Sequence, residues 1–191
     1  MALGTSQAFA TGITITGANT TFTATSSNTT IGDVSSGSTF ACTRSTIGGS
    51  LANVTNAPLP YTTTKADGSP HSITSLTFTG CTDSFGTATL SAGAADLPDD
   101  FVFDSPGPDV LRTAGTAGAL FSVAVLTCSF NVAGTVEFTW TNGTIGQLKL
   151  VGSRPLHPTG ISAGCFGLVS STDTLAWTGT YTVTPPTIMI G

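Results

Sequence analysis

The sequence predicts an all-β protein: a β-sandwich, with a β-barrel as the alternative, of about ten to twelve short antiparallel strands. Short segments alternate between apolar and polar residues and end at Gly, Asn, Ser or Pro, as strands between turns do. No segment repeats apolar residues with the helical period over three turns, and Glu, Lys, Gln and Met are scarce. We favour the sandwich because the loops between the strands are long and irregular.

The first half of the chain has the pattern of a meander. Ile13 and Ile15 alternate with threonines, and Phe40 and Cys42 alternate in the same way, so each pair shares an apolar face. Prolines and an Asp-Gly pair interrupt residues 56–72, which are expected to form a loop. The strands that the alternation predicts here are 11–17, 20–25, 39–42, 47–54, 72–81 and 85–91, the last two as a hairpin.

An acidic, proline-rich segment follows at 93–117. It contains half of the chain's 10 acidic residues together with three prolines, and we expect it to join two pseudo-repeated halves at about 11–92 and 118–186. We favour a single compact domain over residues 1–191, because no flexible linker separates the halves.

The second half has the same texture with more apolar residues. Residues 120–130 are almost continuously apolar, as in a strand covered on both faces, and 132–141 alternate between apolar and polar. Asn142-Gly143 then predicts a two-residue hairpin turn. The remaining predicted segments are the strand 144–151, the loop 152–160 and the strand 175–183.

All four cysteines belong to a repeated frame, in which each half carries a cysteine strand and a later Gly-Cys pair. We therefore predict one disulfide in each half, and a β-bulge at the glycine before each second cysteine. Paired cysteines in a hydroxyl-rich chain favour an oxidising compartment, so the protein is expected to be secreted, extracellular or at the cell surface. The predicted pairs are Cys42 with Cys81 and Cys128 with Cys165, and the glycines are Gly80 and Gly164.

The composition argues against several partners. Charged residues make up 8% of the chain, against about 25% in an average soluble protein, so hydroxyl groups carry the polar surface. The 5 Lys and Arg residues are scattered and form no basic stripe, which argues against nucleic acid. The net charge of -5 argues against anionic lipid, and no apolar run approaches the roughly 18 residues of a transmembrane helix.

A short motif suggests hydrolase chemistry. Gly160-Ile-Ser162-Ala-Gly164 matches the G-x-S-x-G pattern of serine hydrolases, and His157 precedes it. The strand-to-helix turn that presents such a serine is not predicted here, so we favour a loop that leads to the disulfide. The catalytic use of Ser162 and His157 is kept as the alternative. Two histidines and four paired cysteines also leave no zinc site.

The aspartates of the acidic segment are candidate calcium ligands. Calcium prefers oxygen ligands from carboxylates and carbonyls, but the spacing matches no EF-hand loop, and a solvated boundary explains the segment equally well. No other cofactor is expected. Trp140, Trp177 and Tyr181 could stack on a sugar, although their alternation favours the core. The calcium candidates are Asp96, Asp99, Asp100, Asp104 and Asp109.

Three segments resemble a group of secreted, Thr/Gly-rich actinobacterial proteins of uncharacterised function. They are Thr74-Ser-Leu-Thr-Phe-Thr-Gly-Cys81-Thr82, Cys128-Ser-Phe-Asn-Val-Ala-Gly134 and Trp177-Thr-Gly-Thr-Tyr-Thr-Val-Thr-Pro185. The resemblance covers about residues 38–186 and concerns the two-disulfide frame and the strand texture. It implies export and a bacterial source, and it carries over no functional residue.

We therefore expect a secreted or cell-envelope β protein with a structural or interaction role, more readily non-enzymatic than enzymatic. Its weakly charged surface favours self-association, so its expected partners are other copies or envelope components. Two alternatives are a secreted serine ester hydrolase and an envelope pore-forming β-barrel oligomer.

Overall fold

The computed structural model confirms the all-β prediction. The structure describes residues 12–18, 20–62, 72–92, 97, 99–104, 111–113, 119–150 and 155–191. The described residues form antiparallel strands and a single 3-10 turn, η1 (Ala163–Cys165), without an α-helix. In this part of the chain, no helix has the length and apolar character that crossing a bilayer requires.

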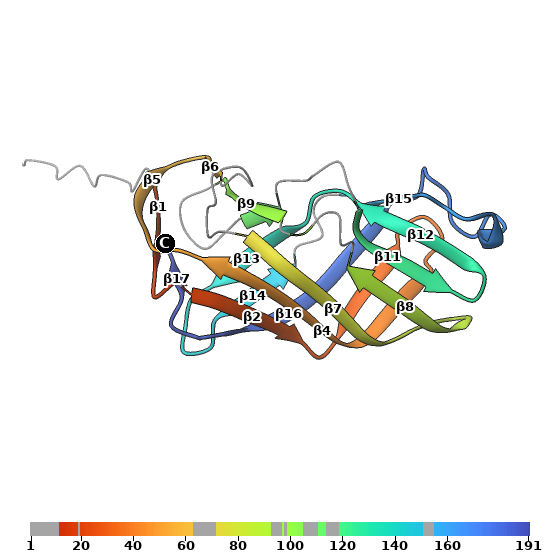
Figure 1. The fold of residues 1–191 in the computed structure, drawn as a ribbon, viewed down its shortest axis with the longest axis horizontal. Coiled ribbons are helices and arrows are strands. Elements are labelled where there is room, and N and C mark those ends of the chain that lie inside the picture. The colour runs from red at the N-terminus through yellow and green to blue at the C-terminus, as the bar shows by residue number, and fades with distance from the viewer. Residues whose placement is uncertain are drawn as a thin grey trace, which may run out of the picture.

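Most of the strands are short. In chain order they are β1 (Gly12–Thr16), β2 (Thr20–Ser26), β3 (Thr29–Asp33), β4 (Thr39–Leu51), β5 (Val54–Pro58), β6 (Tyr61–Thr62), β7 (Ser72–Asp83), β8 (Gly86–Ala92), β9 (Asp99–Phe103), β10 (Leu111–Thr113), β11 (Ala119–Val125), β12 (Cys128–Ala133), β13 (Glu137–Thr141), β14 (Gln147–Leu150), β15 (His157–Thr159), β16 (Leu175–Thr184) and β17 (Met189–Ile190). Figure 1 shows their arrangement in an elongated body.

Long strands build one wall of this body. β4 is a single strand of 13 residues, although the sequence predicted two strands at 39–42 and 47–54. The glycines at 48 and 49 do not turn the chain; they produce only a register shift against β7. β2 and β3 pair with β4 in one continuous register, so that together they occupy a single strand position.

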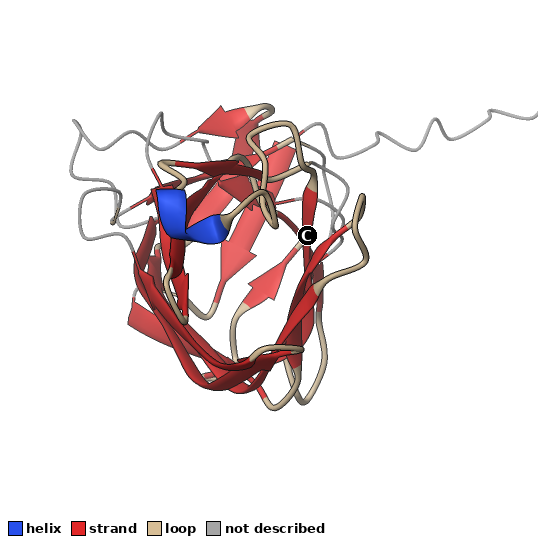
Figure 2. Cartoon of the chain, turned by 90° about the vertical axis from the view of Figure 1, so that its right-hand side faces the viewer, coloured by secondary structure: helices blue, strands red, loops and turns tan. Residues whose placement is uncertain are grey.

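Two closed circuits of strands share this wall of β2–β3, β4, β7 and β16. At one end the circuit runs from β7 through β9, β10, β13 and β14 to β16. At the other end it runs from β7 through β8, β11, β12 and β15, and Leu156 pairs with Leu175 to return to β16. The sheet therefore closes on itself, with the topology of a barrel whose strands surround the core (Figure 2). The β8–β11 and β2–β16 pairings join both halves of the sequence into this one sheet.

Aromatic side chains fill the interior. The ring of Trp177 on β16 lies 5.7 Å from that of Phe78 and 5.6 Å from that of Phe121, so it bridges opposite walls. Trp140, Trp177 and Tyr181 are all buried, which confirms the core interpretation of these residues. A side-chain-filled interior is typical of small barrels.

A second, three-stranded sheet covers one end of the barrel. β1 lies between β17 and β5, and Thr14 and Gly191 exchange backbone hydrogen bonds of 2.7 and 2.9 Å. Ile13, Ile15 and Ile190 of this sheet are buried, as is Ile188 directly before β17. We call this the closed end; it lies on the left in Figure 1.

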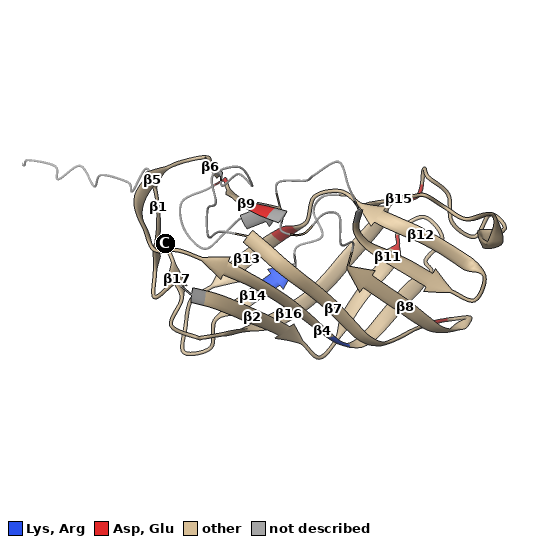
Figure 3. Ribbon diagram, viewed as in Figure 1, with Lys and Arg blue, Asp and Glu red and all other residues tan. Residues whose placement is uncertain are grey.

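The outer face of the barrel carries hydroxyl groups in place of charges. One cross-strand row places outward-facing polar residues directly opposite one another across six neighbouring strands. This row explains how a chain with 8% charged residues keeps a polar surface, and few positions of the ribbon in Figure 3 have the colour of a charged residue. Its members are Thr182, Thr25, Thr46, Thr77, Ser91 and Ser122.

Several predicted loops contain strands instead. The described part of 56–72 contributes to β5 and forms β6, and the described part of 93–117 forms β9 and β10. Phe101, Val102 and Phe103 are buried, and these apolar residues place β9 in the barrel wall despite the acidic residues around them. The loop predicted at 152–160 likewise contains β15.

The hairpins of the second half also differ from the prediction. Residues 120–130 are not one strand, because a turn at Leu126 and Thr127 divides them into β11 and β12. The β13–β14 hairpin exists, but Thr141 pairs with Gln147, so its loop is longer than the predicted two residues. Within this loop the side-chain oxygen of Asn142 accepts hydrogen bonds from the Trp140 indole and the Ile190 backbone. These contacts fix the longer loop against β17.

Candidate functional site

Both predicted disulfides are present, and a single cross-strand row connects them. Cys42 is bonded to Cys81 and Cys128 to Cys165, with sequence separations of 39 and 37. Cys81 lies opposite Ala88, and Ala88 lies opposite Val125. Val125 in turn lies opposite Cys128. The two halves of the sequence therefore place their disulfides at the same end of the barrel, away from the three-stranded sheet. We call this the open end.

The glycines that precede the second cysteines have different roles. Gly80 has φ 61° and lies where the β7–β8 register shifts, which confirms the predicted bulge. Gly164 lies in η1, so the bulge predicted there is wrong. A side chain at Gly164 would collide with the carbonyl oxygen of Thr127, and glycine is needed because the two backbones approach so closely.

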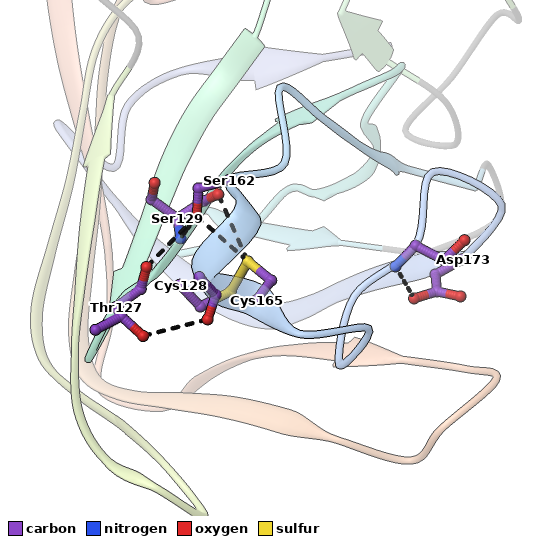
Figure 4. Close-up of a disulfide and its surroundings, with 8 residues drawn as sticks. Thr127, Cys128, Ser129, Ser162, Cys165 and Asp173 are labelled. Carbon is purple, nitrogen blue, oxygen red and sulfur yellow. Dashed lines mark hydrogen bonds between the residues drawn. A yellow bond between two sulfur atoms is a disulfide. The ribbon is translucent and has the colours of Figure 1, made fainter.

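The segment around η1 is fastened to β12 (Figure 4). The Ser162 backbone N–H donates to the Ser129 carbonyl at 2.8 Å, and the Ser129 N–H donates to Ser162 Oγ at 2.9 Å. The Thr127 hydroxyl donates to the Gly164 carbonyl at 3.2 Å, and the Cys128–Cys165 disulfide completes the attachment. The G-x-S-x-G sequence thus forms a structural turn, in which the serine side chain substitutes for a backbone acceptor.

The structure does not bring Ser162 and His157 together. His157 lies opposite Ala133 on β12, whereas Ser162 is hydrogen-bonded to Ser129 of the same strand. Four residues along a strand correspond to about 13 Å, which exceeds the reach of a nucleophile–base hydrogen bond. The Nδ1 atom of His157 instead lies 3.2 Å from the carbonyl oxygen of Asp173.

The calcium candidates are only partly described. Asp96 and Asp109 lie outside the described residues, Asp99 and Asp100 belong to β9, and Asp104 follows that strand. Within the part of the chain that the structure describes, no three or more His, Cys, Asp or Glu side chains are grouped to hold a metal ion.

The open end contains an apolar cavity of about 330 Å³. Its deeper wall consists of buried side chains from β4, β11, β12 and β16, which leave the core uncovered where the barrel ends. Phe40 and Phe130 lie 6.1 Å apart, measured between ring centroids. The main residues of this wall are Phe40, Val125, Cys128, Phe130 and Leu175.

Exposed apolar side chains surround this cavity. Phe166 is 85% exposed, Leu126 is 81% exposed, and Phe85 and Leu168 are each 52% exposed. We call these four residues the rim; all of them line the cavity. They come from the β7–β8 turn, the β11–β12 turn and the segment that follows η1.

The backbone of the rim is strained at two positions. Leu126 has φ 50° and Phe166 has φ 48°, both in the left-handed region that glycine and asparagine tolerate best. This conformation costs a residue with a side chain about 1 to 2 kcal/mol. Since both side chains are largely exposed, their burial within the chain returns little of this cost. Strain at an exposed apolar residue points to a function.

The ionisable side chains that line the cavity, among the described residues, are two carboxylates. Asp33 accepts hydrogen bonds from the Ser35 N–H at 2.7 Å and the Ser36 hydroxyl at 2.6 Å. Burial alone would raise the pKa of Asp33, but these hydrogen bonds outweigh it, so its pKa lies below the ordinary value. Asp83 Oδ1 accepts from the backbone N–H groups of Phe85 and Gly86 and so forms the turn that carries Phe85.

Sequence reasoning missed the rim because turns were treated only as connections between strands. A usable signal was present: Phe85 and Phe166 are each followed by glycine, and Leu126 lies between two apolar strands. A large apolar side chain inside a turn is not directed into the core, so it indicates a contact site on the surface.

The open end thus combines an apolar cavity, a strained apolar rim and two carboxylates within one disulfide-bonded framework. Comparisons of the chain with protein-family models, with curated proteins and with solved structures find no match.

Proposed function

We propose that the protein is a secreted or cell-envelope binding protein, without enzymatic activity, that binds an apolar ligand or partner at its open end. The observation that carries this proposal is the strained, exposed rim around an apolar cavity. Such side chains add little to folding stability, because apolar surface stabilises only when it leaves water. They gain free energy when a partner covers them.

Export is supported by the two disulfides and by the hydroxyl-rich surface. Disulfides form and persist in oxidising compartments, and both bonds here hold the end that carries the cavity. A reducing compartment would remove the covalent attachment of η1, which precedes Phe166 and Leu168, and leave only its hydrogen bonds to the end of β12 and the adjoining turn.

The uncharged dye Nile red, which fluoresces strongly in apolar surroundings, tests this function. We expect saturable binding by the native protein and at least fivefold weaker binding by the Leu126→Gly/Phe166→Gly double variant. Glycine accepts a positive φ, so this variant keeps its turns. Ile145→Ala, which shortens an exposed side chain in the β13–β14 loop, is the matched control and should bind like the native protein. Equal binding by the double variant would contradict the proposal.

A second copy of the chain is a further candidate partner, and the same rim favours it. Two open ends facing each other would bury both rims, as in a twofold homodimer. Sedimentation velocity over a range of protein concentrations would then show a dimer in the native protein. The double variant would remain a monomer.

The two alternative functions stay predictions. A serine hydrolase would be labelled by a fluorophosphonate, and Ser162→Ala would remove the label. The separation of Ser162 from His157 along β12 gives this alternative no support. An envelope pore would be detected as conductance across a planar bilayer.

A further inference from the structure

The cavity has the size and the surroundings of a small-molecule site. Its volume of about 330 Å³ falls within the usual range of ligand pockets, roughly 300 to 1,000 Å³. Its deeper wall is apolar and buried, and its mouth carries aromatic side chains on two separate segments. A ligand that fills it must present a hydrocarbon body to Phe40 and Phe130.

Resting on the function proposed above, we propose that the ligand is a small amphiphile with a hydrocarbon body and a cationic head. The body occupies the space beside Phe40 and Phe130, and the head lies at the mouth with Asp33, Asp83 and the rings of the rim. Substituted ammonium groups fit this description.

The carboxylates that line the cavity determine which sign of charge the head of the ligand carries. No Lys, Arg or His is among the described residues that line the cavity, whereas Asp33 and Asp83 are. Asp33 is ionised at neutral pH, because its pKa lies below the ordinary value. A carboxylate or sulfate head would lie beside like charges in an apolar site, where repulsion is poorly screened.

The Asp83 carboxylate has acceptor capacity left for a ligand. Each ionised carboxylate offers about four lone-pair sites. Asp33 is hydrogen-bonded by the backbone and the side chains of both Ser35 and Ser36, whereas Asp83 uses only Oδ1 for its own turn. Among the described residues, none donates a hydrogen bond to Oδ2 of Asp83. Asp83 can therefore hold its turn and still accept a hydrogen bond from a ligand, while Asp33 contributes its negative charge.

The rim supplies the second element that an ammonium group needs. Aromatic faces attract cations, and aromatic cages are a recurrent means of binding quaternary ammonium ligands. Phe85 and Phe166 line the same cavity as the two carboxylates, and Phe85 lies two residues beyond Asp83. The mouth thus offers rings and carboxylates together, which favours a cation over an uncharged head.

Isothermal titration calorimetry with three octyl amphiphiles tests this inference. The probes are octyltrimethylammonium, octyl glucoside and octanoate, each below its critical micelle concentration, so that only the head differs. We expect the cationic probe to bind at least tenfold more tightly than octanoate, with the glucoside between them. Near-ultraviolet circular dichroism would verify that the protein stays folded.

Two variants that each remove one carboxylate charge test whether Asp83 and Asp33 cause the preference for the cationic probe. Asp83→Asn keeps the oxygen that accepts from Phe85 and Gly86, so the turn is retained while the charge is removed. We expect it to reduce the preference for the cation over octanoate at least threefold. Asp173→Asn, which changes a carboxylate outside the cavity lining, should leave the preference unchanged. Asp33→Asn provides a second charge removal if Asp83→Asn fails to fold.

The outcomes separate this inference from the function on which it rests. If the protein binds Nile red but binds the three octyl probes with equal affinity, or prefers octanoate, the proposed cationic head is wrong. The proposed binding function would still hold. A cation preference that survives both Asp83→Asn and Asp33→Asn would also overturn it. If the native protein binds neither Nile red nor any of the three octyl probes, both proposals are wrong.

Discussion

The two ends of the barrel are built from similar apolar residues, but only one end is covered by the chain itself. At the closed end, β17, β1 and β5 form a sheet in which Ile13, Ile15 and Ile190 are buried. At the open end, Phe166 and Leu126 are almost fully exposed around a cavity. Apolar residues at a barrel end are thus no functional signal by themselves. The feature that indicates a function is that, among the described residues, no other segment of the chain covers the apolar side chains of the open end.

Backbone strain separates the ends in the same way. At the closed end the non-glycine residue with positive φ is Asn56, of the type that tolerates this conformation. At the open end the equivalent residues are Leu126 and Phe166, which do not. Folding stability alone would favour glycine or asparagine at all three positions. The open end therefore keeps side chains that cost stability, which is common at binding sites.

The largest expected effect comes from the disulfides, which both lie toward the open end. Each closes a loop of nearly forty residues, so removing either pair by Cys→Ser changes should lower the free energy of unfolding by about 4 kcal/mol. Urea denaturation measures this loss. Only the Cys128→Ser/Cys165→Ser variant should also lose Nile red binding while folded, because, of the two disulfides, only this one attaches η1 to β12. If Cys42→Ser/Cys81→Ser loses binding equally, η1 does not form the site.

A matched pair of substitutions gives the next effect. Ile15→Ala removes a fully buried side chain at the closed end and should lower the free energy of unfolding by about 3 kcal/mol, with Nile red binding unchanged. Leu126→Gly should change that free energy by less than about 1 kcal/mol, because relief of the left-handed strain offsets the greater freedom of the unfolded chain. Its Nile red binding should fall. Thermal unfolding and dye titration of both variants measure these effects. If Ile15→Ala lost binding and Leu126→Gly lost stability instead, the division between the ends would be contradicted.

The smallest expected effect is the loss of folding stability when Asp33 is protonated at low pH. Because the pKa of this carboxyl is lowered in the folded protein, its contribution to stability is present above the ordinary pKa near 3.8. That contribution is lost as the pH falls further, through the pKa of the folded state. Asp33→Asn should therefore flatten the decline in stability below about pH 4. Urea midpoints of the native protein and the variant between pH 2 and 6 test this, and parallel curves would contradict it.

Much of the strand pattern could be predicted from the sequence. Alternation is a local property, so the strands Glu137–Thr141 and Leu175–Thr184 and the burial of Trp177 and Tyr181 follow from neighbouring residues. The breaks were harder to predict. The division of 120–130 at Leu126 depends on a left-handed residue that is neither glycine nor asparagine, and no propensity predicts such a residue.

The candidate site was predictable only in its covalent part. The repeated cysteine frame predicted both disulfides, yet it said nothing of their common position. That position depends on the register of β4, β7, β8, β11 and β12, which is set between residues far apart in the chain. Ser162 was singled out for chemistry, and tertiary contacts with Ser129 give it a structural role.

The sequence by itself determined the all-β class, the faces of most strands and the disulfide pairing, because these follow from local periodicity and from an internal repeat. Tertiary structure alone decided that the sheet closes into two circuits, that one end is covered by β1, β5 and β17, and that the other is left open. The reason is physical. A local pattern says whether a side chain is apolar, but whether that side chain is covered depends on which distant segment reaches it.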